Sequence, residues 1–178
     1  MIVKKLMAYP AGRVACAVSA GMGAMLLRSS AWIENTVFIG GAAQLASLLC
    51  GSPTVKTAEG WVLPLAEVPV IVTAACSATD FYVMTAVLLG WHLAKRTGRV
   101  FAVIGAMLAA VPLTLAINAL RIVAVAQAHR WAIPHAPEAY EKSLHMLTGV
   151  AVFLPALIAL NLIFETYGRS SDARACNH

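Results

Sequence analysis

The chain has 178 residues, the length of a single domain, and its composition excludes a water-soluble fold. Hydrophobic residues make up 60% of the sequence and charged residues only 12%, against roughly 25% charged residues in a soluble domain. A soluble protein of this size has too little interior for that much apolar surface, so we interpret the chain as an integral membrane protein. Its net charge of +5 is then mainly a signal of membrane orientation, not of nucleic-acid binding.

The first span follows a short basic lead, residues 1–13. It covers about Tyr9–Leu27, is rich in Gly and Ala, and is about long enough to cross a bilayer. No small-residue cleavage site follows the basic pair Lys4-Lys5, so we expect the span to be retained and not removed as a signal peptide. The next apolar stretch, Thr36–Leu49, has only 14 residues. That is short for a span, and we expect a re-entrant or interfacial helix there.

A polar segment separates this stretch from the next span. Residues 54–56 and 61–63 have strand character and flank a short polar turn, which predicts a small β-hairpin. Pro64 and Pro69 are expected to limit regular structure after the hairpin. A β-prone run, Val70–Thr73, then meets the start of a helix near Cys76.

Three further spans complete the predicted fold. They cover Thr79–Ala94, Val100–Ala128 with a kink at Pro112, and Leu144–Phe164. A basic loop joins the first two, and a polar loop, residues 129–142, joins the last two. The sequence therefore predicts an all-α membrane protein of about four transmembrane helices, with the re-entrant helix and the hairpin added. We assign residues 1–166 to one membrane-embedded domain and residues 167–178 to a cytoplasmic polar tail, which we expect to be disordered.

The basic residues predict which loops face the cytoplasm, because Lys and Arg near span ends mark that side. The N-terminus, the second loop and the tail each carry such residues: Lys4, Lys5 and Arg13; Lys95, Arg96 and Arg99; Arg169 and Arg174. Four crossings with both termini inside satisfy all three groups, provided that residues 36–49 do not cross. The hairpin and the starts of the helices at residues 79 and 144 then lie on the outer face.

Cys76 is the strongest candidate for a nucleophile. Ser77 and Thr79 are plausible N-caps of the helix that begins beside it. A thiol at this position lies among unpaired backbone N–H groups and near the positive end of the helix dipole, which favours the thiolate. Two structural alternatives remain open: a small apolar residue at a helix entrance, and a disulfide with Cys50.

Arg121 is the least expected residue of the apolar run in which it lies. At 1.5 Å per residue it is about 31 Å from the start of its helix, which brings it to the outer interface beside Cys76. An arginine in a span costs a few kcal/mol and by default marks a functional site. Asn118, one turn earlier, is placed to hold it. The alternative is an arginine that snorkels to the lipid interface.

His145 begins the last span on the same face and is our candidate proton carrier, although an interfacial histidine is the simpler interpretation. Asp80, one turn below Cys76, is placed either to orient a base or to act as a capping charge. A metal site built from His129, His135, His145 and Cys76 is a further alternative without diagnostic spacing. We expect neither a metal ion nor a cofactor.

Three short motifs resemble those of the exosortase/archaeosortase family of membrane-embedded cysteine transpeptidases. The run A-A-C-S-A (residues 74–78) resembles the Cys-Ser-Gly motif of the family, with Ala78 in place of the usual glycine. N-A-L-R-I (residues 118–122) is similar to its Asn-x-x-Arg-Ile motif, and H-M-L-T-G-V-A-V-F (residues 145–153) to its His-x-x-x-Gly-x-x-x-Phe motif. Order and spacing agree over roughly residues 36–160, hairpin included. The small number of spans resembles a compact form such as the K type.

The resemblance implies Cys76 as nucleophile, Arg121 as transition-state stabiliser and His145 as proton carrier. Asn118, Ser77 and Asp80 would support the site or bind the substrate. In the bacterial branch of the family, the substrates are exported proteins with a C-terminal signal: a Pro-Glu-Pro-like motif, a transmembrane segment and a basic cluster. The expected location is the bacterial inner membrane, with the site on the periplasmic face and no nucleic-acid partner.

Two other functions remain open at this point. The first is an intramembrane cysteine protease that uses water as the acceptor. The second is a non-catalytic membrane subunit, a transporter or assembly partner, in which Arg121 pairs with a carboxylate of a partner helix.

Overall fold

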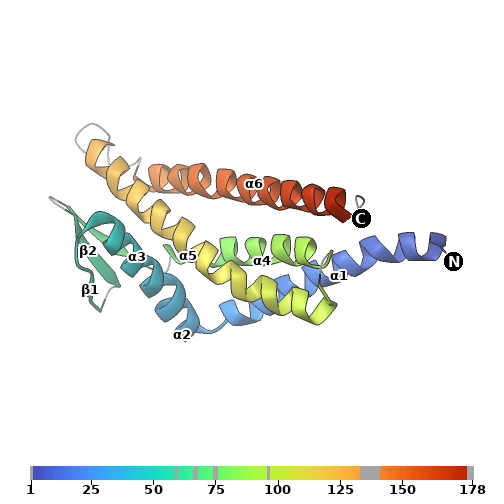
Figure 1. Cartoon of the computed structure of the whole chain (residues 1–178). Helices are drawn as coiled ribbons and strands as arrows, with labels where there is room; N and C mark the ends of the chain where they lie inside the picture. The colour runs from blue at the N-terminus through green and yellow to red at the C-terminus, as the bar shows by residue number, and fades with distance from the viewer. Residues whose placement is uncertain are drawn as a thin grey trace.

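A computed structural model describes residues 2–58, 60–65, 68–73, 76–95, 97–132 and 141–175, and shows a helical protein with a small sheet at one end (Figure 1). The helices are α1 (Ile2–Arg28), α2 (Ala31–Ile33), the π-helix η1 (Glu34–Gly40), α3 (Gly41–Cys50), α4 (Thr79–Leu93), α5 (Arg99–Ala132) and α6 (Glu141–Ala175). The strands are β1 (Val55–Lys56), β2 (Trp61–Leu65) and β3 (Val68–Val72).

Three helical segments of the described chain are long and apolar enough to cross a membrane: Ala31–Cys50, Arg99–Ala128 and Met146–Thr166. They indicate a multi-pass membrane protein and agree with the last two predicted spans. The first of them contradicts the reason for expecting a re-entrant or interfacial helix at residues 36–49, which was that this stretch is too short to cross. Residues 36–49 belong to a continuous helical run of 20 residues, because α2, η1 and α3 follow one another directly.

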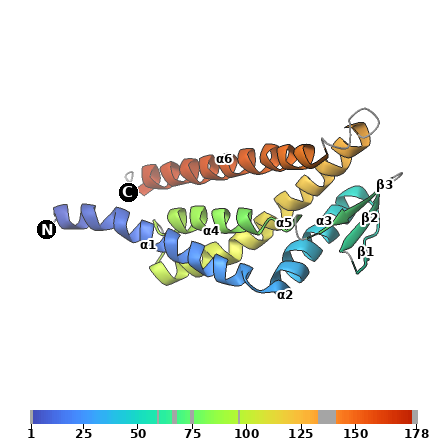
Figure 2. The same cartoon turned by 180° about the vertical axis from the view of Figure 1, so that it is seen from behind.

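The two termini lie at one end of the molecule, and the sheet lies at the other end, where α5 finishes and α6 begins (Figures 1 and 2). The chain runs from the terminal end to the sheet through α1 and α2–α3 and returns through α4. It then repeats this path through α5 and α6. Arg13 of α1 marks the terminal end, where its guanidinium lies 3.8 Å from the ring centre of Trp91 of α4.

Small residues bring α1 and α4 into close contact. A Cβ atom at Gly90 of α4 would lie only 3.1 Å from the backbone oxygen of Cys16 and 3.1 Å from the Cβ of Ala20. Ala17, Ala20 and Ala24 of α1 are buried in this contact region. Small residues at helix interfaces allow such close approach in membranes, which explains the Gly- and Ala-rich composition of the first helix.

Helix α4 agrees to within one residue with the helix expected at residues 79–94, but with 15 residues it is not among the segments long enough to cross a membrane. It packs chiefly against α1 and α5, and its buried residues include Tyr82, Ala86 and Leu89. Helix α5 continues through Pro112 without interruption to Ala132. The polar tail expected to be disordered is helical as far as Ala175, because α6 extends beyond its apolar part. Most of the loop expected at residues 129–142 lies outside the described residues.

The predicted hairpin is part of a three-stranded antiparallel sheet with the order β1-β2-β3. Lys56 pairs with Trp61, and Val62 with Ile71. The expectation that Pro64 and Pro69 limit regular structure is wrong, because the two prolines face each other in the β2–β3 ladder. A proline has no backbone N–H to donate, so it is tolerated at a position where the ladder makes no hydrogen bond. The sheet packs through the buried residues Leu63 and Val72 onto α3 and α5.

Candidate active site

The residues before α4 form a tight turn that connects the sheet to the helix. The backbone N–H of Cys76 donates to the carbonyl of Thr73, the residue after β3, at 2.8 Å. Ala78 is the N-cap of α4 and has a left-handed backbone with φ 53° and ψ 23°. Side chains with a Cβ atom pay about 1 kcal/mol or more in this conformation, which glycine adopts freely. The turn therefore places a conformational demand on position 78 that an alanine meets only at a cost.

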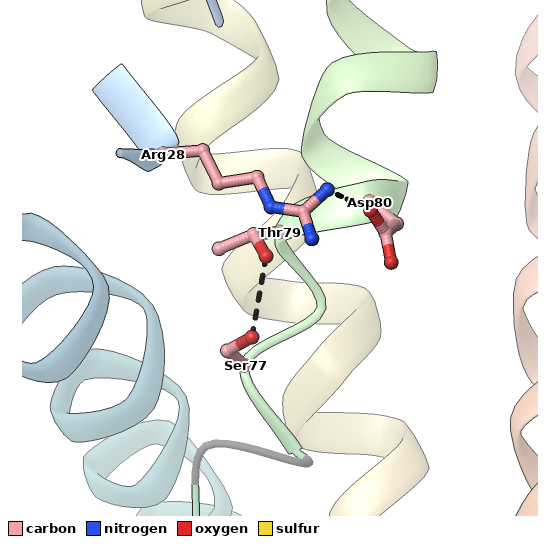
Figure 3. A network of polar contacts seen from close by, with 4 residues as sticks. All are labelled: Arg28, Ser77, Thr79 and Asp80. Atoms are coloured by element: carbon pink, nitrogen blue, oxygen red, sulfur yellow. Dashed lines mark hydrogen bonds and ion pairs between the residues drawn. The ribbon is translucent and has the colours of Figure 1, made fainter. Parts of the chain in front are cut away.

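The expected N-caps are wrong, since the left-handed turn moves the helix start to Ala78 and α4 has no side-chain cap hydrogen bond. The hydroxyls of Ser77 and Thr79 lie instead 3.3 Å from each other, as Figure 3 shows. Both side chains are buried. Cys76 consequently lies three residues before the first helical residue, not within the first turn.

The side chain of Cys76 is 9% exposed and packs in an apolar cluster with Val72 of β3 and Ala119 of α5. Its carbonyl accepts a hydrogen bond of 2.6 Å from the amide Nδ2 of Asn118, which is fully buried. Asn118 was expected to hold Arg121, but this bond ties α5 to the Cys76 turn. Cys50 and Cys76 are both free thiols, so the disulfide alternative is not formed in the described structure.

Arg121 follows Asn118 by one turn of α5 and is only 7% exposed. Helix α6 covers it: a Cβ atom at Gly149 would lie 3.2 Å from the Nε of Arg121, and its guanidinium carbon lies 5.2 Å from the ring centre of Phe153. Phe153 in turn stacks on Phe81 of α4, with ring centres 4.7 Å apart. Arg121 thus lies inside the protein where three helices meet, and it does not extend to the lipid surface as a snorkelling arginine would.

A cavity of about 450 Å³ opens beside this arginine. Helices α4, α5 and α6 form most of its wall, and Arg28 of α1 and Glu34 of η1 complete it. The lining residues are Arg28, Glu34, Ser77, Ala78, Thr79, Asp80, Phe81, Met84, Arg121, Phe153 and Leu157. The buried guanidinium of Arg121 gives one side of the pocket a fixed positive charge, and such a group can stabilise negative charge that develops on a bound molecule.

Asp80 lies in the first turn of α4 and forms an ion pair with Arg28 (Figure 3). The carboxylate is largely exposed and the guanidinium half-buried, so the pair lies at the mouth of the cavity. The sequence analysis did not identify Arg28 and Glu34 as site residues, because charged residues are common at the ends of apolar runs. The ion pair between residues 52 positions apart appears only in the fold.

His145 belongs to the first turns of α6, four residues before Gly149. Positions four apart share one face of a helix, so its backbone is on the face that meets Arg121. Its rival His129 is near the end of α5, and His135 lies outside the described residues. His92 is at the opposite end of α4, where its Nε2 lies 3.1 Å from the Oδ1 of Asn161.

The structure thus joins Cys76, Asn118 and Arg121 around one turn and places Ser77 and Asp80 on the cavity wall. The sulfur of Cys76 is not among the lining atoms: it lies behind the wall, in the apolar cluster. Among the residues that the structure describes, no group of three or more His, Cys, Asp or Glu side chains is placed to hold a metal ion. No family model, no curated protein and no solved structure matches the chain.

Proposed function

We propose that the protein is a membrane-embedded cysteine transpeptidase or protease of the exosortase type, which cleaves the C-terminal sorting signal of exported proteins. The observation that carries the proposal is the meeting of α5 with the Cys76 turn. Asn118 binds the carbonyl of Cys76, and Arg121, one turn further, lines the cavity that the next residues of the turn also line. A thiol, an amide and a guanidinium from distant parts of the chain share one small region.

In the proposed reaction, the Cys76 thiolate attacks the carbonyl carbon of the scissile peptide, and a C–S bond forms. The negative charge that develops on the carbonyl oxygen is stabilised by Arg121. The C–N bond then breaks, and His145 donates a proton to the leaving amine. A thioester acyl-enzyme remains. Water or an amine attacks it, His145 accepts the proton of this second nucleophile, and the C–S bond breaks to restore the thiolate.

The proposed reaction requires the Cys76 thiol to leave the apolar cluster and turn towards the cavity. Cysteine has a single side-chain torsion with three staggered positions. Cys76 directly precedes Ser77, which already lines the cavity. A rotation of this torsion from the apolar cluster towards the cavity is the step that we assign to substrate binding.

The proposed substrates are exported proteins held in the bilayer by a C-terminal tail, in which a Pro-Glu-Pro-like motif precedes an apolar helix and a basic cluster. The proposed location is the bacterial inner membrane, with the sheet and the cavity at the periplasmic face. Impermeant thiol labelling of single-cysteine variants tests this orientation. A cysteine placed within residues 96–98 should label only after the membrane is opened, whereas labelling of intact cells would reverse the orientation.

The alternative of a non-catalytic subunit is less well supported. It requires a carboxylate of a partner helix to reach Arg121. Gly149 and Phe153 of α6 already cover that side chain, and the cavity beside it opens next to the Arg28–Asp80 pair. A partner carboxylate would therefore have to reach Arg121 through the cavity and not across the face covered by α6.

The test of the function is the processing of a reporter protein that ends in a Pro-Glu-Pro motif, an apolar helix and an arginine cluster. The wild-type chain should shorten this reporter when both are expressed in the same membrane. Cys76→Ala should abolish processing while the protein still accumulates, and Cys16→Ala, Cys50→Ala and Cys176→Ala should process normally. Processing that survives Cys76→Ala would refute the thiol mechanism. If Cys50→Ala also abolished processing, the loss in Cys76→Ala would point to a structural role for the thiols instead.

A further inference from the structure

The hydrogen-bond pattern of the sheet determines which backbone groups of β3 point away from it. The N–H of Thr57 donates to the carbonyl of Gly60, so the pair 57–60 is hydrogen-bonded and the next pair, Lys56 and Trp61, is not. In antiparallel ladders the two kinds of pair alternate, and a residue that bonds to one neighbouring strand faces away from the other. Val62 therefore bonds towards β1, and its partner on β3, Ile71, directs its N–H and carbonyl away from β2.

The prolines give the same result independently. Pro64 faces Pro69, and neither can donate, so this pair is also of the type without hydrogen bonds. Two positions further along the strand, Ile71 has the same orientation. Because β3 is the last strand in the order β1-β2-β3, no strand of the described chain accepts from the Ile71 N–H. The side chain of Ile71 is 42% exposed, in contrast to its buried neighbour Val72.

This open edge leads directly to the candidate nucleophile. Cys76 follows Ile71 by five positions, and its N–H donates to the carbonyl of Thr73, the residue after β3. Pro69 lacks an N–H, so it ends the useful edge on the far side. By the same alternation the carbonyl of Pro69 also faces outward, so Ile71 is the position of β3 that presents both an outward N–H and an outward carbonyl.

We propose that this edge of β3 binds an extended segment of the peptide substrate as a fourth strand and so presents the scissile bond to Cys76. The inference rests on the proposed function and adds the subsite by which the substrate is held. An added strand exchanges two hydrogen bonds with Ile71 and gains affinity from main-chain contacts, whatever the substrate side chains are. Such an edge suits substrates that share a short motif and otherwise differ in sequence.

The test measures binding apart from catalysis, in the Cys76→Ala background, with a fluorescent peptide made of the Pro-Glu-Pro motif, an apolar helix and an arginine cluster. Ile71→Pro removes the outward N–H and leaves the β2 ladder bonds in place, as at Pro69. We expect it to weaken binding about tenfold or more. Ile71→Val keeps the N–H and should bind normally. The matched control is Lys56→Pro, which removes an outward N–H at the opposite edge of the sheet and should also bind normally.

A second arm uses peptides N-methylated at single positions around the motif, so that it needs no altered protein. Methylation at the residue opposite Ile71 should weaken binding about as much as Ile71→Pro, and the two changes together should cost little more than either alone. Unchanged binding in both arms would overturn the proposal. So would a loss of chain self-association in Ile71→Pro without a change in peptide binding, because the edge would then join two copies. Failure of the wild type to cleave a peptide that Cys76→Ala binds at this edge would refute the proposed function alone.

Discussion

Substitution of Gly149 by alanine tests whether α6 sets the position of the Arg121 guanidinium. The added Cβ atom would lie 3.2 Å from Nε, 3.6 Å from Nη2 and 3.7 Å from Cζ of Arg121, so the guanidinium must withdraw by a few tenths of an ångström. A misplacement of about 1 Å costs about 10²-fold in rate, and the smaller shift should reduce kcat about 3- to 10-fold. The same change should stabilise α6 by about 1 kcal/mol, because alanine has the higher helix propensity.

The two effects have opposite signs, which separates a catalytic effect from simple damage to the fold. The assay compares reporter processing with thermal unfolding in detergent for Gly149→Ala. The control is Gly105→Ala in α5, whose new Cβ would meet its nearest neighbour, the Cδ1 of Leu93, at an ordinary 3.7 Å. The control should gain stability and keep its rate. Equal rates for wild type and Gly149→Ala would refute the claim that α6 positions Arg121.

Three further substitutions test the remaining parts of the site. Arg121→Lys keeps the charge but loses the planar pair of donors, so it should insert normally and lose about 10²–10³ in kcat, whereas a rate within a few-fold of wild type would contradict the oxyanion role. Ala78→Gly should raise the stability of the protein by about 1 kcal/mol in thermal unfolding, because glycine adopts the left-handed backbone at position 78 without strain; a lower stability would mean that this turn is not strained. His145→Ala should stop reporter turnover at equal expression while His129→Ala and His135→Ala do not, and normal turnover by the first with a dead His135→Ala would place the base on the loop.

Composition and the apolar runs were enough to predict a multi-pass helical membrane protein, and the last two predicted spans were confirmed as long apolar helical segments. The bounds of α4 were also predicted to within one residue, but the extent of the helical segment from Ala31 was not. Helix α4 packs chiefly against α1 and α5, so its length need not match the thickness of the bilayer. The π-helix η1 carries Glu34 and Asn35 inside a helical run, and these polar residues made the apolar stretch look shorter than the helix is.

The site residues were easier to name than their contacts were to predict. Arg121 was identifiable because an arginine within an apolar run is costly and by default marks a functional site. In the structure it is buried under α6 and does not face the lipid. The caps at Ser77 and Thr79 failed because the turn takes its shape from a left-handed alanine, a conformation that no propensity scale assigns to alanine. The contact of Asn118 with the Cys76 carbonyl joins residues 42 positions apart, and local spacing carries no information about it.

The packing of α6 explains how a largely lipid-facing helix can hold a buried arginine. It contacts α4 through two ring stacks, Phe153 on Phe81 and Phe164 on His92. Both members of the second pair follow those of the first by 11 residues, close to three helical turns, so each helix uses one face. The equal spacing also requires α4 and α6 to run in the same direction. Helix α5, which lies between them in the sequence, runs in the opposite direction.

This parallel arrangement places the two stacks at opposite ends of α4 and the cavity next to the first of them. Gly149 lies one turn before Phe153, so the stack that fastens α6 also fixes the height at which Gly149 meets Arg121. The second stack, together with the contact between His92 and Asn161, prevents α6 from turning about the first. Gly149 and Phe153, four residues apart on one face of α6, are therefore both held in contact with a single side chain, that of Arg121.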